Sequence, residues 1–169
     1  MSSSTSLKTA ALVSVTAAAT ALLIQACGGG AVAQSASDAD PIEGVWDSTV
    51  TIKDCTSGAV QTTFKGFLVF HRGGTMQIDS THSALVPPIR GSIYGTWKRD
   101  VGSAYTANLV HLRFNPDSTL AGTGKIQRAV TVAADGNNFT ATLAIRNIDT
   151  AGVVQLQRCA SETAARVTW

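Results

Sequence analysis

Lys125 to Ile148 reads KIQRAVTVAADGNNFTATLAIRNI, and this stretch decides the fold. Apolar residues alternate with polar ones on each side of Asp135-Gly136, which is a dipeptide typical of tight hairpin turns. One face of the first half carries Ile126, Val130 and Val132, and one face of the second half carries Phe139, Ala141, Leu143 and Ile145. The stretch therefore predicts two antiparallel strands, each with one buried face.

The same pattern continues in both directions along the chain, without a sustained helical period. Short segments rich in Val, Ile, Thr and aromatic residues are separated by Gly, Asp, Asn and Pro, and this predicts eight to nine strands. The expected strands are Val45–Lys53, Phe64–His71, Thr75–Thr81, Ser92–Arg99, Tyr105–Phe114, Lys125–Ala134, Phe139–Ile148, Val153–Cys159 and a short Thr163–Trp169.

The predicted fold class is all-β, a single antiparallel meander. Two architectures fit, a closed barrel and a β-sandwich. Successive neighbouring hairpins favour the barrel, because closure removes exposed sheet edges. One domain over residues 43–169 is long enough to have its own core. Residues 82–91 contain Pro87-Pro88, which forbids a central strand, and we expect either a loop over one barrel end or an ordinary surface connection.

The N-terminal segment has the order of an export signal. Lys8 precedes an apolar run at residues 9–24, which is shorter than the roughly 20 residues of a membrane-spanning helix. The following Leu23-Ile24-Gln25-Ala26-Cys27 resembles the bacterial lipobox, in which a peptidase cuts before a lipidated cysteine. This resemblance implies a signal peptide at 1–26, lipid attachment at Cys27 and a flexible small-residue tether at 27–42.

An alternative cut after Ala33, at the A-x-A-like Ala31-Val32-Ala33, would release the protein instead. Lipidation would anchor it in the cell envelope as a membrane protein facing the periplasm or the exterior. No Asp follows Cys27, which favours the outer membrane where the host has one.

The other two cysteines form an even pair once Cys27 carries lipid. We expect a disulfide between Cys55 and Cys159 in an oxidising compartment, with two separate buried thiols as the alternative.

The charge balance argues against a nucleic-acid partner. Removing Lys8 from the 13 basic side chains leaves 12 against 11 acidic ones, and no basic stripe appears. The sequence identifies no protein partner.

Gly44-Val45-Trp46 opens the first strand, and Gly95-Thr96-Trp97 repeats the pattern near the middle. A G-x-W at the start of an eight-stranded meander resembles the lipocalins and the wider calycin group. The resemblance implies that Trp46 closes one barrel end and that a late arginine, Arg158 or Arg166, packs across its ring. The domain is shorter than most lipocalins and lacks their later motifs, so the resemblance concerns architecture more than activity. Small exported bacterial proteins of unassigned function show a similar overall pattern.

No catalytic or metal motif is found in the sequence. Five acidic residues occupy turns, where hydrogen bonds to the following backbone explain them: Asp54, Asp100, Asp117, Asp135 and Asp149. The histidines have no metal-ligand spacing, and we predict no metal, no cofactor and no assigned catalytic residue.

His111 and Arg113 share one strand face opposite Val110, Leu112 and Phe114. We expect this polar pair to face water, while the alternative places it in the lumen, where arginine binds an anionic head group. The candidate ligand-binding residues are Phe67, Arg90, Trp97, Leu109, His111 and Arg113.

The leading hypothesis is a membrane-anchored barrel that binds a small apolar or amphipathic molecule. One alternative is a ligand-free structural or protein-interaction module of the cell envelope, with a lumen filled by side chains. A third is an enzyme that uses His111 or His71 as acid and base with an arginine as anion clamp.

Overall fold

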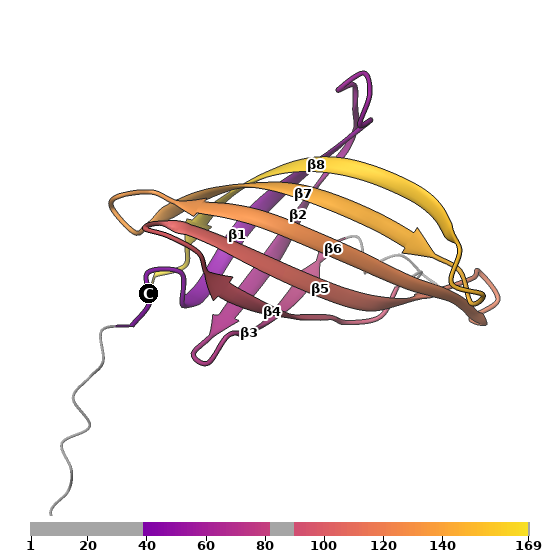
Figure 1. Cartoon of the computed structure of the whole chain (residues 1–169), viewed down its shortest axis with the longest axis horizontal. Helices are drawn as coiled ribbons and strands as arrows, with labels where there is room; N and C mark the ends of the chain where they lie inside the picture. The colour runs from indigo at the N-terminus through magenta and orange to yellow at the C-terminus, as the bar shows by residue number, and fades with distance from the viewer. Residues whose placement is uncertain (1–38, 82–89, 169) are drawn as a thin grey trace, which may run out of the picture. The chain divides into compact units, whose positions relative to one another are not determined.

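The computed structural model describes residues 39–81 and 90–168. Within these ranges the chain forms eight β-strands (Figure 1): β1 (Gly44–Lys53), β2 (Val60–His71), β3 (Thr75–Ser80), β4 (Ile93–Arg99), β5 (Ala104–Phe114), β6 (Leu120–Val132), β7 (Asn138–Ile148) and β8 (Val154–Arg166). No helix in these ranges is long and apolar enough to cross a bilayer. The predicted signal peptide and most of the tether, and residues 82–89 of the predicted end-covering loop, lie outside the described residues.

Every strand pairs antiparallel with its neighbour in sequence, and β1 also pairs with β8, so the sheet closes into a barrel. The seam between the first and last strands runs from Trp46 opposite Arg166 to Lys53 opposite Cys159. This confirms the predicted all-β meander barrel with eight strands, and it excludes the sandwich, because a sandwich has no such first-to-last pairing.

The last strand differs from the prediction. Two short strands were expected near the C-terminus, but β8 is one strand of 13 residues. The intervening Ala160-Ser161-Glu162 has weak β-propensity, yet it pairs with β1 on one side and β7 on the other. Tertiary pairing therefore continues the strand through a segment whose composition suggests a break.

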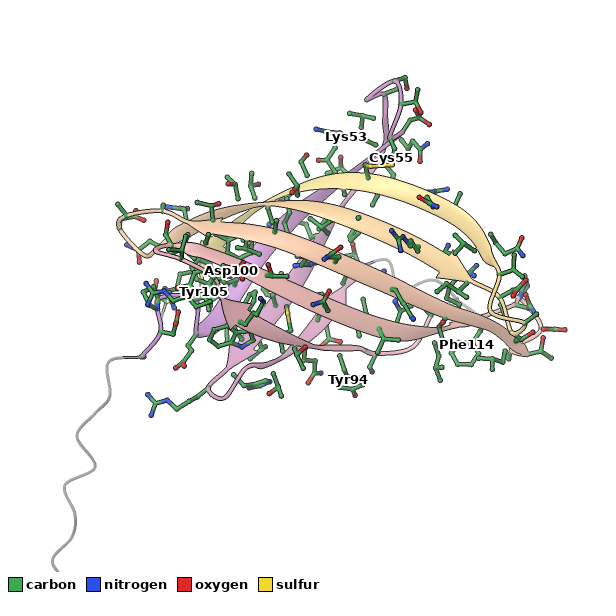
Figure 2. The ribbon with its side chains drawn as sticks, in the orientation of Figure 1. Lys53, Cys55, Tyr94, Asp100, Tyr105 and Phe114 are labelled. Carbon is green, nitrogen blue, oxygen red and sulfur yellow. A yellow bond between two sulfur atoms is a disulfide. The ribbon has the colours of Figure 1, made fainter. Side chains whose placement is uncertain are left out.

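One end of the barrel is filled by aromatic side chains. Trp46 and Phe139 meet edge to face with ring centroids 4.9 Å apart, and Phe70 contacts both Phe139 and Trp97 at 6.2 Å. Tyr105 completes the cluster at 6.0 Å from Trp97. Figure 2 shows Tyr105 at the end of the barrel opposite Phe114. These large rings close this end, since aromatic residues fill most of its cross-section.

Arg166 covers the outer side of this aromatic end. Its guanidinium lies 4.3 Å from the centroid of the Trp46 ring, and it donates hydrogen bonds to the carbonyls of Glu43, Pro41 and Gly136. The Trp46 indole donates to the Ile42 carbonyl at 2.8 Å. Between the two late arginines that the sequence left open, the structure places Arg166 over Trp46.

Gly44 explains why the tripeptide before this contact begins with glycine. Its φ is +123°, which favours glycine, and a Cβ there would lie 2.8 Å from Nη1 of Arg166. A side chain at position 44 would therefore displace the arginine from its place over the indole ring.

A disulfide joins Cys55, just beyond β1, to Cys159 on β8 (Figure 2). The two residues are 104 positions apart in sequence, and their Cα atoms are 5.0 Å apart. The predicted pairing is confirmed, and it fastens the β1–β8 seam that closes the barrel.

Candidate ligand-binding site

A cavity of about 520 Å³ occupies the barrel beyond the aromatic cluster. It lies between the inner faces of the strands and reaches the β5–β6 hairpin at Phe114, Asn115 and Pro116. Its apolar walls are Val50, Ile52, Phe64, Ile78, Ile93, Ala121, Ile126, Leu143, Ile145 and Leu156. Its polar groups come from Ser48, Ser80, Arg90, His111, Arg113, Asn147, Arg128 and Arg158. A volume of this size with apolar walls and a few inward polar groups is typical of small-molecule sites.

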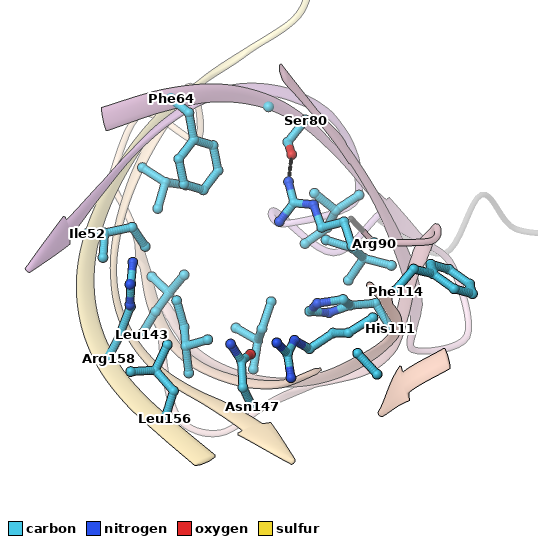
Figure 3. A pocket seen from close by; sticks show the side chains of 18 of the residues that line it. Ile52, Phe64, Ser80, Arg90, His111, Phe114, Leu143, Asn147, Leu156 and Arg158 are labelled. Carbon is cyan, nitrogen blue, oxygen red and sulfur yellow. Dashed lines mark hydrogen bonds between the residues drawn. The ribbon is translucent and has the colours of Figure 1, made fainter. Parts of the chain in front are cut away.

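The lumen stays open beyond the aromatic cluster because the inward residues of β1 and β2 are small there. At the filled end the inward positions of β1 and β2 hold Trp46, Leu68 and Phe70, whereas the next inward pair along these two strands is Ser48 opposite Gly66. Figure 3 looks into the resulting opening and shows Arg90, His111 and Asn147 directed into it from different parts of the wall.

Arg90 and Arg113 lie directly opposite each other. They form an isolated antiparallel β-bridge, and both residues line the cavity. Like charges directly across a strand pair are destabilising. Arg90 donates a hydrogen bond to the Ser80 hydroxyl, and its guanidinium lies 5.8 Å from the Phe64 ring centroid, but its buried Nε has no partner among the described residues. Burial also lowers the pKa of Arg90 below its ordinary value.

His111 lies on the cavity wall next to these two arginines and is only 8% exposed. Burial, followed by the positive charges of Arg90 and Arg113, lowers its pKa from 6.5 to about 4, so the imidazole is neutral at pH 7. Its buried Nδ1 has no hydrogen-bond partner within residues 39–81 and 90–168. A Cβ at Gly124, its cross-strand neighbour, would come within 2.0 Å of the ring, so glycine is what lets the ring lie against β6.

The expectation that His111 and Arg113 face water was wrong. The opposite face of β5 is the outer one, where Val110 is 47% exposed and Leu112 is 49% exposed. The prediction from hydrophobicity failed for this strand because the barrel is hollow at this level. A polar side chain can face a cavity as readily as solvent, and an apolar one remains on the outside.

Arg128 and Glu162 form a buried ion pair that the sequence analysis missed. Nη1 of Arg128 lies 2.8 Å from Oε2 of Glu162, and the two side chains are 3% and 0% exposed. Burial lowers the pKa of Arg128, and the charge of Glu162 opposes this effect. A signal was present, since Arg128 has the same parity as the inward Ile126 and Val130 on its strand.

The remaining sequence candidates lie elsewhere in the barrel. Phe67 is on the outer face and 54% exposed, because its neighbours Gly66 and Leu68 take the inward positions. Trp97 belongs to the aromatic cluster and Leu109 to the buried core, and neither lines the cavity. Arg158, the other late arginine considered for Trp46, lines the cavity instead. Arg90, His111 and Arg113 are therefore the candidates that the structure brings together.

The lining offers ligand recognition more readily than metal or acid–base chemistry. Among residues 39–81 and 90–168 no group of three His, Cys, Asp or Glu side chains could hold a metal ion. No described residue of the cavity lining is acidic, so His111 has no carboxylate there to orient it. With a pKa of about 4, His111 is also poorly matched to proton transfer near neutral pH.

Comparisons with known proteins add no assignment to this geometry. No protein-family model, no curated protein and no solved structure matches the chain.

Proposed function

We propose that this protein is an exported, membrane-anchored binding protein that holds a small amphipathic molecule in the lumen of its barrel. The observation that carries the proposal is the cavity of about 520 Å³, with mainly aliphatic walls and polar groups at defined points. A ligand-free module would instead need a lumen filled along its length by its own side chains, and the described side chains fill the aromatic end in this way but leave the cavity beyond it.

Two features support the proposed setting and architecture. The lipobox-like segment ending at Cys27 supports lipid anchoring in the cell envelope, and the Cys55–Cys159 disulfide suits an oxidising compartment. The contact of Arg166 with Trp46 is similar to the end-closing pair of lipocalins, a group whose barrels hold small ligands. Mass spectrometry of the mature N-terminus tests the anchor. A diacylated Cys27 supports it, and a free amine at Gln34 would exclude it.

Binding in the lumen is tested with a variant that fills the cavity. Leu143 faces inward on β7 and its neighbour Thr142 faces outward, so Leu143→Trp and Thr142→Trp form a matched pair on one strand. We expect displacement of a fluorescent fatty acid to show binding by the wild type and by Thr142→Trp, and loss of binding in Leu143→Trp. Circular dichroism and thermal unfolding verify that both variants fold. Equal binding by both variants would refute the proposed site.

A further inference from the structure

We propose that the ligand carries a head group with two negative charges, of the phosphate monoester class, bound by Arg90 and Arg113. This inference depends on the proposed function, because it specifies the ligand of the same cavity. The amphiphile is then an alkyl or aryl phosphate rather than a fatty acid or a neutral lipid.

The lumen carries an excess of positive charge. Four arginines line the cavity, and within the described residues only Arg128 has a carboxylate partner, Glu162. Among the described residues, Arg90, Arg113 and Arg158 have no acidic partner. Charges removed from water are costly unless they are paired, so a ligand that fills the cavity should bring a compensating anion. A single carboxylate balances one of the two charges of Arg90 and Arg113, whereas a phosphate monoester carries about −1.5 to −2 at pH 7.

The hydrogen-bond donors of the lining also suit a phosphate head group. Arg90 and Arg113 are direct cross-strand neighbours that both line the cavity, and the charges of both act on His111. Among the described residues, the buried Nε of Arg90 has no hydrogen-bond partner, and neither has Nδ1 of His111, a residue more than nine-tenths buried. Buried donors without partners are uncommon in folded proteins. Arginine binds phosphate through paired hydrogen bonds, and the three terminal oxygens of a phosphate monoester can accept from more than one guanidinium.

Another part of the lining is apolar. Ile52, Leu143, Ile145 and Leu156 supply aliphatic wall from β1, β7 and β8, while the paired arginines are on β5 and the segment just before β4. Figure 3 shows Arg90 and His111 on one side of the lumen and Ile52, Leu143 and Leu156 on the other. A ligand with a charged end and an apolar body fits both parts of this surface, whereas inorganic phosphate would leave the aliphatic part uncovered.

The test compares ligands that differ only in the head group. The purified full chain is titrated by calorimetry with dodecyl phosphate, dodecanoate and dodecanol, each below its micelle concentration, and with inorganic phosphate. Because a hydrogen bond to a charged group contributes about 1.5 to 3 kcal/mol, we expect dodecyl phosphate to bind at least about tenfold more tightly than dodecanoate. Dodecanol and inorganic phosphate should bind more weakly than dodecanoate.

Variants show whether this preference comes from the arginines. Arg90→Met and Arg113→Met should each lower the affinity for dodecyl phosphate about tenfold or more and leave dodecanol binding unchanged. Arg146→Met is the matched control, since Arg146 is an exposed arginine on the outer face of β7. It should bind like the wild type, and thermal unfolding verifies that each variant is folded.

The outcomes separate the two proposals. Equal affinity for dodecyl phosphate and dodecanoate, or a preference that survives in both arginine variants, would overturn the dianion inference and leave the lumen site standing. Failure of every alkyl compound to bind would refute the proposed function, and the inference with it. Inorganic phosphate binding as tightly as dodecyl phosphate would support the dianion site but refute an amphipathic ligand.

Discussion

Neutralising Glu162 tests the buried ion pair most severely. Arg128 and Glu162 are 3% and 0% exposed, and their charged atoms are 2.8 Å apart. Glu162→Gln keeps the shape of the side chain but leaves the Arg128 guanidinium without a counter-charge. Removing one partner of such a pair costs about 3 to 5 kcal/mol, because the remaining charge stays buried.

The assay is urea unfolding at pH 7, followed by tryptophan fluorescence with the disulfide intact. With an m-value of about 1 to 3 kcal/mol/M, the expected loss corresponds to a fall of roughly 1 to 5 M in the unfolding midpoint. Asp47→Asn is the control, since the Asp47–Lys65 pair has side chains that are 42% and 57% exposed. Such a surface pair contributes about 1 kcal/mol or less.

A double variant separates the charge effect from packing. Arg128→Met with Glu162→Gln removes both charges, and we expect it to recover most of the stability that Glu162→Gln loses. If the free energy of unfolding of Glu162→Gln lies within about 1 kcal/mol of the wild-type value, which is the most that a surface pair contributes, this reasoning is contradicted. A double variant no more stable than the single one would also contradict it.

Three further predictions concern the histidine, the disulfide and the closed end. Because the pKa of His111 falls from 6.5 to about 4 on folding, the unfolded chain takes up the proton first as the pH drops. The free energy of unfolding should therefore decrease by about 3 kcal/mol between pH 6.5 and pH 4. In His111→Asn this decrease should be absent when urea unfolding is measured at the two pH values. Replacing Cys55 and Cys159 together by alanine opens a loop of 104 residues. The free energy of unfolding should then fall by about 4 to 5 kcal/mol on the chain-entropy model, and an unchanged midpoint would contradict it. Arg166→Met should destabilise the barrel by about 2 kcal/mol or more in thermal unfolding, because the Trp46 contact and three hydrogen bonds to carbonyls are lost. A change below 0.5 kcal/mol, the range of ordinary surface substitutions, would count against it.

Alternation in the sequence was sufficient to predict an antiparallel meander, and the succession of neighbouring hairpins favoured the barrel over the sandwich. Phe139–Ile148, which has a clear two-residue period, appears in the structure with Phe139, Ala141 and Leu143 buried. The turn aspartates were also readable, since Asp54, Asp117, Asp135 and Asp149 accept hydrogen bonds from backbone amides that follow them. Asp100 instead accepts from the Thr106 hydroxyl at 2.6 Å.

The interior of the hollow half could not be read in the same way. Hydrophobicity separates buried from exposed positions, but it does not separate a water-facing surface from a polar lumen. This is why β5 was assigned with His111 outward. The pairing of Arg128 with Glu162 depends on a register between strands that are distant in sequence, and that register is set by the closed sheet.

The position of Arg90 was beyond sequence reasoning for a related reason. It follows a segment without a strand pattern, and only the bridge to Arg113 brings the two side chains together at the lumen. Local patterns predict which residues share a face of one strand, whereas a site assembled from several strands also needs the spacing and stagger of the barrel.

The most direct measurement is a crystal structure of the protein grown with ω-bromododecyl phosphate, in which anomalous scattering locates the bromine. The account predicts a bromine peak inside the barrel, in the cavity lined by Ile52 and Leu143, with the phosphate in contact with Arg90 and Arg113. A bromine peak only on the outer face, or an empty lumen at saturating ligand, would contradict it.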